Sequence, residues 1–200
     1  VSLIARFAAS ENEDENSNSV RDCLKSLFFI YLSGTHASLG DRVEFIEELL
    51  SSDDVKMQEL GLLALDTALE TWHFISHYEF SFGARSRDYG YQPKGQEILP
   101  WYENFIKLCT DHALSSKPTA SEAKKVLAGK MRGLWTNAGA FDALENSVRT
   151  IRKNQSWNEG WIASNSILKF DSKDIPKDAL ERLHMLREAL TPHDIENLAR

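Results

Sequence analysis

Hydrophobic positions recur with helical spacing most clearly between residues 41 and 71, which read DRVEFIEELLSSDDVKMQELGLLALDTALET. The first half of this stretch has one apolar face, and that face is typical of an amphipathic helix. The predicted buried stripe comprises Val43, Ile46, Leu49 and Leu50. Asp41, with Glu44 three residues later, predicts a capping box at the start of the helix. The short acidic turn at residues 51–54 then predicts a second helix antiparallel to the first.

The second helix of this pair is apolar on more than one face. Its main stripe comprises Leu60, Leu63, Ala64, Ala68, Trp72 and Ile75. Further apolar residues lie off that stripe, at Leu62, Leu65 and Leu69. A helix that is apolar on several faces needs neighbours on several sides. The pattern therefore predicts an inner helix within a stack of helix pairs.

The remainder of the chain shows the same periodicity and no alternation typical of strands. Further helices are predicted over residues 1–9, 20–33, 100–114, 119–135, 141–151, 157–170 and 177–190. Residues 11–19 are polar and acidic and predict an exposed linker. Between residues 83 and 95 the helical pattern is interrupted by Gly and Pro, which predicts a long irregular loop. The expected fold class is all-α.

Composition agrees with a globular helical chain. The 200 residues are 42% hydrophobic and 26% charged, and 10 Gly and 5 Pro are few for a protein built from many tight turns. The net charge of −7 makes nucleic-acid binding an unfavoured function, because an acidic surface repels phosphate backbones. Cys23 and Cys109 lack the spacing of a metal site and are expected to be reduced and in or near the core, which fits a cytoplasmic location. No apolar run approaches the roughly 20 residues that cross a bilayer, so no membrane partner is expected.

Both ends of the sequence suggest a piece of a longer protein. The chain starts at Val1 inside an apolar segment, and Thr191-Pro192 has the pattern of a new helix start. The expected organisation is a single all-helical domain over residues 1–200. Its possible subdivision is helix pairs over 1–80, an irregular loop over 81–100 and further helix pairs over 101–200.

The irregular loop is the leading candidate for a functional site. It contains three cations that could bind an anion and two tyrosines that could stack on a base or frame a peptide. The candidate ligand- or partner-binding residues are Arg85, Arg87, Asp88, Tyr89, Tyr91 and Lys94. The alternative is a structural insertion packed on the helices, with its arginines paired to Asp88 or Glu97. Long irregular loops on rigid scaffolds often carry function, which keeps the first interpretation open.

Two other residue pairs invite a functional interpretation. His73 and His77 lie one helical turn apart, as in helical zinc sites, but the sequence HFISH lacks the glutamate of a zinc protease. Histidines at a helix end are the simpler interpretation, and no metal site is expected. Trp157 and Trp161 are also one turn apart, and core packing, with Gly160 permitting a close approach, is favoured over a ligand platform. No phosphate-binding, dinucleotide-binding or hydrolase motif is present, so neither a cofactor nor a catalytic residue is expected.

The pairing of RVEFIEELL with LGLLALDTAL resembles a HEAT-type repeat, a family of degenerate helix pairs that stack into an α-solenoid. Residues 119–152 and 157–190 repeat the paired-helix pattern with weaker likeness. The stretches SRDYGYQP, LWTNAGAFDALENSVRTI and WNEGWIA resemble helical sensor or scaffold regions of large bacterial multidomain proteins. The resemblance implies an irregular HEAT-like α-solenoid of stacked antiparallel helix pairs.

Three function classes follow from these patterns. The first is a non-catalytic scaffold or regulatory module that binds a protein partner or a neighbouring domain of its own chain. The second is an enzyme or ligand-binding domain with an anion site between Arg85 and Tyr91. The third is a HEAT-like nucleic-acid binder, which would need its cations gathered on one face.

Overall fold

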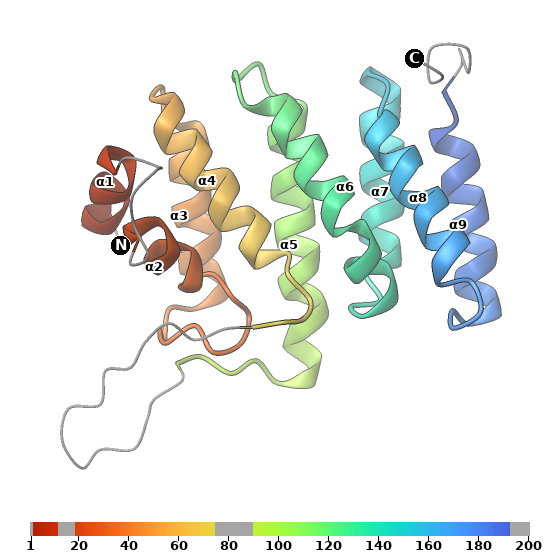
Figure 1. Ribbon diagram of the computed structural model, residues 1–200, viewed down its shortest axis with the longest axis horizontal. Coiled ribbons are helices and arrows are strands. Elements are labelled where there is room, and N and C mark those ends of the chain that lie inside the picture. The colour runs from red at the N-terminus through yellow and green to blue at the C-terminus, as the bar shows by residue number, and fades with distance from the viewer. Residues whose placement is uncertain (1, 12–18, 75–89, 193–200) are drawn as a thin grey trace. The chain divides into compact units, whose positions relative to one another are not determined.

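The computed structural model describes residues 2–11, 19–74 and 90–192, and all structural statements below refer to these residues. They contain helices and no strand, so the predicted all-α class is confirmed (Figure 1). The helices are α1 (Ser2–Ser10), α2 (Val20–Ser26), α3 (Leu39–Ser51), α4 (Val55–Ala68), α5 (Gly95–Ala113), α6 (Ala120–Thr136), α7 (Phe141–Asn154), α8 (Asn158–Phe170) and α9 (Lys177–Leu190). The chain divides into two compact units, unit 1 (Val1–Phe105) and unit 2 (Ile106–Arg200), and the division falls within α5. No helix of the described residues is both long and apolar enough to cross a membrane.

Unit 1 is organised around α4. This helix packs against α3 and also against α1 and α2, so the prediction of neighbours on several sides is confirmed. Gly61 makes the close approach of α3 possible, because an added Cβ atom at that position would lie 2.9 Å from Cδ2 of Leu50. Asp54 caps α4 by accepting a hydrogen bond from the backbone of Lys56 at 2.9 Å.

The start of α3 differs from the sequence prediction by one helical turn. Ser38, not Asp41, is the N-cap residue, and its hydroxyl accepts from the Asp41 amide at 3.2 Å. Asp41 is at the third helical position and accepts in return from the Ser38 amide at 2.8 Å. The Ser38 hydroxyl also donates to Oδ2 of Asp41 at 2.6 Å, and this bond, followed by the bond from the Ser38 amide, lowers the pKa of Asp41 because both stabilise the ionised carboxylate. One residue of the predicted stripe, Val43, is only half-buried, whereas its neighbour Arg42, which was not in the stripe, is buried.

Two predicted helices in unit 1 end early. The helix expected over residues 20–33 ends at Ser26, and residues 27–38 form an irregular segment whose Phe28, Phe29 and Ile30 lie in the core. The helix expected to carry Trp72 ends at Ala68, and Trp72 lies outside it with its ring exposed. Neither helix is followed directly by a Gly or Pro residue that would mark its end. The helical spacing of apolar residues also continues past both ends, so the sequence predicted longer helices.

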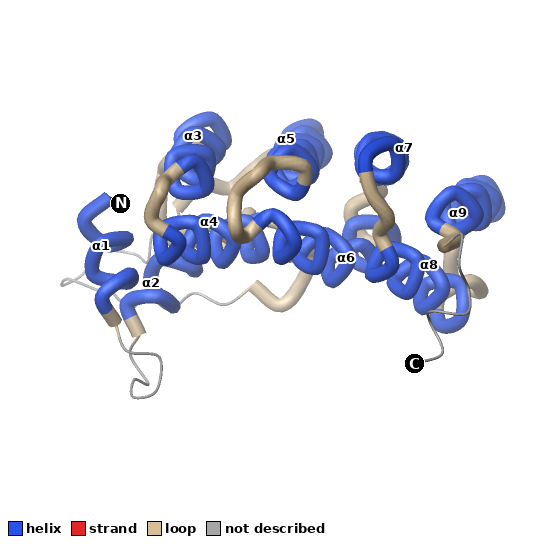
Figure 2. The backbone as a smooth tube through the Cα atoms, turned by 90° about the horizontal axis from the view of Figure 1, so that it is seen from above, coloured by secondary structure: helices blue, strands red, loops and turns tan. Residues whose placement is uncertain are grey.

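Unit 2 consists of helices in two rows. Figure 2 shows α6 and α8 side by side in one row, and α7 and α9 in the other. Contacts run between α6 and α8, between α8 and α9, between α7 and α9, and between α6 and α7. The helix predicted over residues 141–151 is present as α7, with Leu144, Val148 and Ile151 buried and Phe141 half-buried.

The residues that precede α6 and α8 make no side-chain cap and instead pack within unit 2. The hydroxyl of Thr119, which precedes α6, lies 2.9 Å from Nε2 of the buried His112. Trp157 precedes α8 and is buried, as predicted, while Trp161 is half-buried. Gly160 does permit a close approach, but the group that approaches is the Trp157 indole, 2.7 Å from an added Cβ.

Candidate functional site

The predicted loop site lies mostly outside the described residues. This applies to four of its six candidates, Arg85, Arg87, Asp88 and Tyr89. The role of these four in anion or partner binding therefore stays a prediction. The other two, Tyr91 and Lys94, lie between the loop and α5.

Tyr91 is held against the irregular segment that precedes α3. Its amide donates a hydrogen bond to the carbonyl oxygen of Thr35 at 2.7 Å. Gly90 permits this approach, because its φ is +79° and an added Cβ would lie 2.4 Å from the Thr35 nitrogen. The Tyr91 ring lies 5.9 Å from the guanidinium carbon of Arg42. Burial, followed by the Glu97 charge, raises the pKa of Tyr91, so its phenol is neutral at physiological pH.

Lys94 has a different environment. Its side chain is exposed, and its amide donates to Oε2 of Glu97 at 2.7 Å, which satisfies a backbone donor at the start of α5. Tyr91 and Lys94 thus have definite roles at the junction between the loop and α5.

Arg42 is a buried cation for which the sequence predicted neither a functional nor a structural role. Its side chain is 2% exposed and donates to Phe29 O at 2.8 Å, Ser33 Oγ at 3.0 Å and Ala37 O at 3.2 Å. A fourth, longer hydrogen bond of 3.4 Å reaches the carbonyl of Thr35. The guanidinium also lies 5.1 Å from the Trp101 ring. Burial lowers the pKa of Arg42 to about 10, and the side chain stays charged at neutral pH.

The donors of Arg42 explain how the core residues of segment 27–38 can be buried without being helical. A buried carbonyl without a donor is costly, and a guanidinium provides several donors in a fixed fork. The bonds of Arg42 tie together the segment on which Tyr91 packs. We therefore assign this cluster a structural role, since its donors are used by oxygens of the fold.

The histidine pair receives no support as a metal site. His73 lies beyond the end of α4 with a φ of +58°, and His77 lies outside the described residues. In the part of the chain that the structure describes, no three His, Cys, Asp or Glu side chains lie close enough to hold a metal ion. Neither cysteine is in a disulfide, and Cys109 is buried as expected, whereas Cys23 is half-buried.

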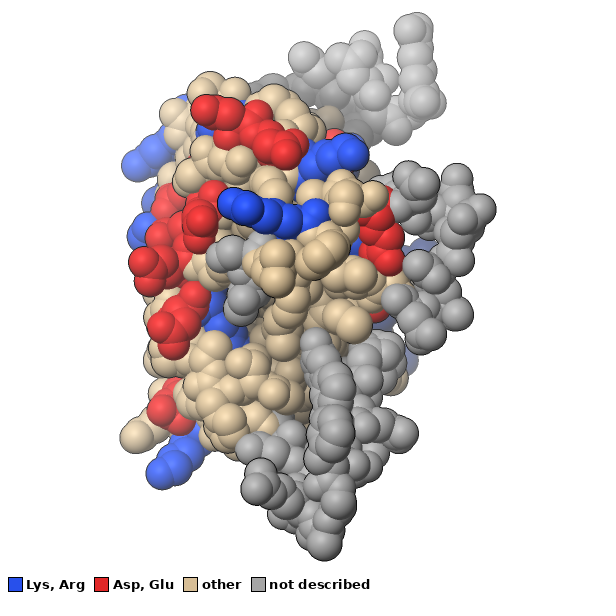
Figure 3. Space-filling view, turned by 90° about the vertical axis from the view of Figure 1, so that its left-hand side faces the viewer, with Lys and Arg blue, Asp and Glu red and all other residues tan. Residues whose placement is uncertain are grey.

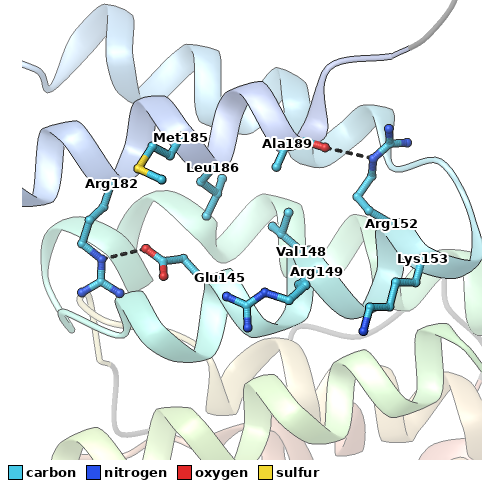
Figure 4. Close-up of a pocket in the computed structure, with 9 residues that line it drawn as sticks. All are labelled: Glu145, Val148, Arg149, Arg152, Lys153, Arg182, Met185, Leu186 and Ala189. Atoms are coloured by element: carbon cyan, nitrogen blue, oxygen red, sulfur yellow. Dashed lines mark hydrogen bonds and ion pairs between the residues drawn. The ribbon is translucent and has the colours of Figure 1, made fainter.

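A groove on unit 2 runs between α7 and α9 and has a volume of about 570 Å³. Its lining residues are Glu145, Val148, Arg149, Arg152, Lys153, Arg182, Met185, Leu186 and Ala189. Figure 4 shows Val148, Met185 and Leu186 in its middle, with an arginine toward each end. Met185 is 71% exposed. Val148 and Leu186 are each only 3% exposed, so Met185 is the residue that opens the apolar middle of the groove to solvent.

The two ends of the groove are fixed by arginines that bridge α7 and α9. At one end, Nε of Arg182 donates to Glu145 at 2.7 Å, and Arg182 also pairs with Asp142. These carboxylates raise the pKa of Arg182. At the other end, Nε of Arg152 donates to the carbonyl of Ala189 at 3.0 Å, near the C-terminus of α9. Both bridges hold the helices at a defined separation.

The other two cations of the groove are positioned differently. Arg149 and Lys153 are exposed and lie one helical turn apart along α7. Arg149 donates to the Asn146 amide oxygen at 2.9 Å, and neither cation forms an ion pair with a described carboxylate. Their charges are therefore available to a molecule in the groove.

The charge of the chain is unevenly divided between the two units. Residues 1–105 carry 8 Lys and Arg against 18 Asp and Glu, a net charge of −10, whereas residues 106–200 carry 15 against 12, a net charge of +3. Acidic side chains are prominent on the face seen in Figure 3, and α3 contributes exposed Asp41, Glu44, Glu47 and Glu48. The net charge of −7 is thus the sum of an acidic unit 1 and a weakly basic unit 2, and the groove lies on unit 2.

Sequence reasoning missed the groove, although two signals were present. Arg149, Arg152 and Lys153 are three cations within five residues, and Met185 lies beside the regular Leu183–Leu186 spacing. The signals were not decisive because the groove is formed by residues 37 positions apart, such as Val148 and Met185. Comparison of the chain with protein-family models, curated proteins and solved structures returned no match. Functional inference therefore depends on the geometry of the chain itself.

Proposed function

We propose that this chain is a non-catalytic interaction module built from HEAT-like helix pairs, and that the α7–α9 groove of unit 2 is its docking surface. The single observation that carries the proposal is the open apolar middle of the groove, where Met185 is exposed between two helices. An apolar strip between two rigid helices is the feature that helix-in-groove recognition uses. Paired-helix scaffolds bind their partners along such surfaces.

The titratable groups favour binding over catalysis. In the described residues the buried groups with shifted pKa values include Arg42, Tyr102 and His112. Each of them is hydrogen-bonded within its own unit, and none lines the groove. Arg182 does line it, but its pKa is raised by two carboxylates that hold it as a structural cation. The groove therefore offers an apolar surface and positive charge to a binding partner.

A peptide-display selection tests this function. The chain is immobilised, a random peptide library is selected on it, and the affinities of enriched peptides are measured for Met185→Asp and for the matched control Ile162→Asp. Ile162 is an exposed apolar residue of α8 that does not line the groove. We expect Met185→Asp to weaken binding about tenfold or more, since it places a charge in the apolar middle, and Ile162→Asp to leave it unchanged.

Two results would overturn the proposal. One is a selection that enriches no peptide on the unchanged protein. The other is a set of peptides that bind Met185→Asp as tightly as they bind the Ile162→Asp control. Circular dichroism of both variants excludes unfolding as the cause of any loss.

A further inference from the structure

The charges around the groove restrict what it can bind. Four of its lining residues are cations and one is a carboxylate, Glu145. That carboxylate accepts the 2.7 Å hydrogen bond from Arg182 and is thereby compensated within the wall. A positive excess remains around an apolar middle, and such a surface is complementary to a ligand that is both apolar and negatively charged.

The two exposed cations define where the negative charge would lie. Arg149 and Lys153 are on the same side of α7, one turn apart, and Figure 4 shows both directed away from α9 along one edge of the groove. Val148 lies one residue before Arg149, so apolar and cationic positions run in parallel along α7. A ligand that fits this wall presents an apolar stripe to the groove and a parallel row of acids to its edge.

We propose that the occupant is an acidic amphipathic peptide segment of a partner protein, bound with its apolar face over Met185 and its carboxylates opposite Arg149 and Lys153. This inference rests on the proposed docking function and specifies its partner class. A peptide matches the groove because side chains spaced at 3.6 residues per turn provide both rows at once.

Synthetic peptides of defined composition test the partner class. The first probe is an 18-residue fluorescent peptide with leucine on one helical face and glutamate on the rest. The second replaces every glutamate by lysine, and the third scrambles the order of the first. We expect the acidic amphipathic peptide to bind at least about tenfold more tightly than the lysine peptide, and its affinity to fall with rising salt.

Charge-neutralising variants locate the contact. Arg149→Gln with Lys153→Gln removes the two exposed cations of the groove. Lys169→Gln with Lys173→Gln is the matched control, because both lysines are exposed on unit 2 and lie outside the groove. We expect the first pair of substitutions to weaken binding of the acidic peptide about fivefold or more and to reduce the salt dependence of that binding. The control pair should change neither.

The outcomes separate this inference from the proposed function. If library peptides bind through Met185 but are not acidic, the docking function holds and the partner class proposed here is wrong. If the lysine peptide or the scrambled acidic peptide binds equally well, the partner class is also wrong. The partner class would also be wrong if a 20-nucleotide oligothymidine bound more tightly than the acidic peptide with the same dependence on Arg149 and Lys153. That result would indicate a nucleic acid as the occupant of the groove.

Discussion

The Nη1 group of Arg42 on α3 donates a hydrogen bond to the carbonyl oxygen of Phe29 at 2.8 Å, thirteen residues earlier in the chain. This bond joins a buried cation to a buried carbonyl group in a non-helical segment. Each group provides the hydrogen-bond partner that the other lacks. The guanidinium finds oxygen acceptors in place of water, and the segment finds donors in place of a helix. Neither could be buried at acceptable cost without its partner.

Arg42→Met is therefore expected to destabilise unit 1. Methionine fills much of the volume but leaves the Phe29 carbonyl and its neighbours without a donor, at a cost of about 3 kcal/mol. Urea denaturation measures the loss, and hydrogen exchange should accelerate first in residues 27–38. Arg6→Met, on an exposed position of α1, is the control and should change stability by less than about 0.5 kcal/mol. Equal stability of the two variants would contradict the structural role of Arg42.

Gly90→Ala is expected to detach Tyr91 from Thr35. Alanine is strained at a φ of +79°, and its Cβ would meet the Thr35 backbone, so about 1–3 kcal/mol is lost locally. The Tyr91 amide, which donates to Thr35, should then exchange its hydrogen faster. Gly95→Ala is the matched control, since an added Cβ there meets nothing within 4 Å. Unchanged protection of the Tyr91 amide in Gly90→Ala would refute the contact.

Gly160→Ala and Gly129→Ala are expected to change the stability of unit 2 in opposite directions. At Gly160 the new methyl group would collide with the Trp157 ring, which is buried and donates to the Lys124 carbonyl at 3.2 Å, so about 1–3 kcal/mol is lost. At Gly129, within α6, an added methyl group meets no atom within 4 Å, and alanine should stabilise the helix by about 0.5–1 kcal/mol. Thermal unfolding of both variants measures the difference. A gain at both positions would show that Trp157 can move aside.

His112 should make the stability of unit 2 depend on pH. Burial, with the Lys117 charge as a smaller cause, lowers the pKa of His112 below its ordinary value of 6.5. The unfolded chain therefore binds this proton at a higher pH than the folded chain does. The stabilisation is complete above about pH 6.5 and is lost as the pH falls from there through the folded-state pKa.

His112→Gln isolates this contribution. Glutamine can still reach the Thr119 hydroxyl and does not titrate, so the variant should lose less stability than the unchanged protein between pH 7.5 and 5. Urea denaturation at several pH values gives the two slopes. His184→Gln, at an exposed position of α9, is the control and should keep the original slope. Identical slopes for His112→Gln and the unchanged protein would assign the pH dependence to other groups.

The sequence by itself determined the helices and most of their buried faces. Leu144, Val148 and Ile151 could be predicted to lie inward, because the spacing of a helix is local and its apolar stripe must be covered. The pairing of α3 with α4 was equally readable, since a turn of three residues leaves two amphipathic helices no other way to bury their stripes. Helix ends were less readable, as α2 shows by stopping at Ser26 within a continuing apolar pattern.

Only the tertiary structure decided where a helix ends within a continuing apolar pattern. It also decided which apolar side chains stay exposed to solvent. Residues 27–38 are irregular because Arg42 supplies donors from the next helix, and no local rule contains that information. Met185 is exposed on α9 although side chains of α7 and α9 bridge the two helices at Arg182 and Arg152. Both outcomes depend on side chains that meet across the fold, whereas periodicity describes one helix at a time.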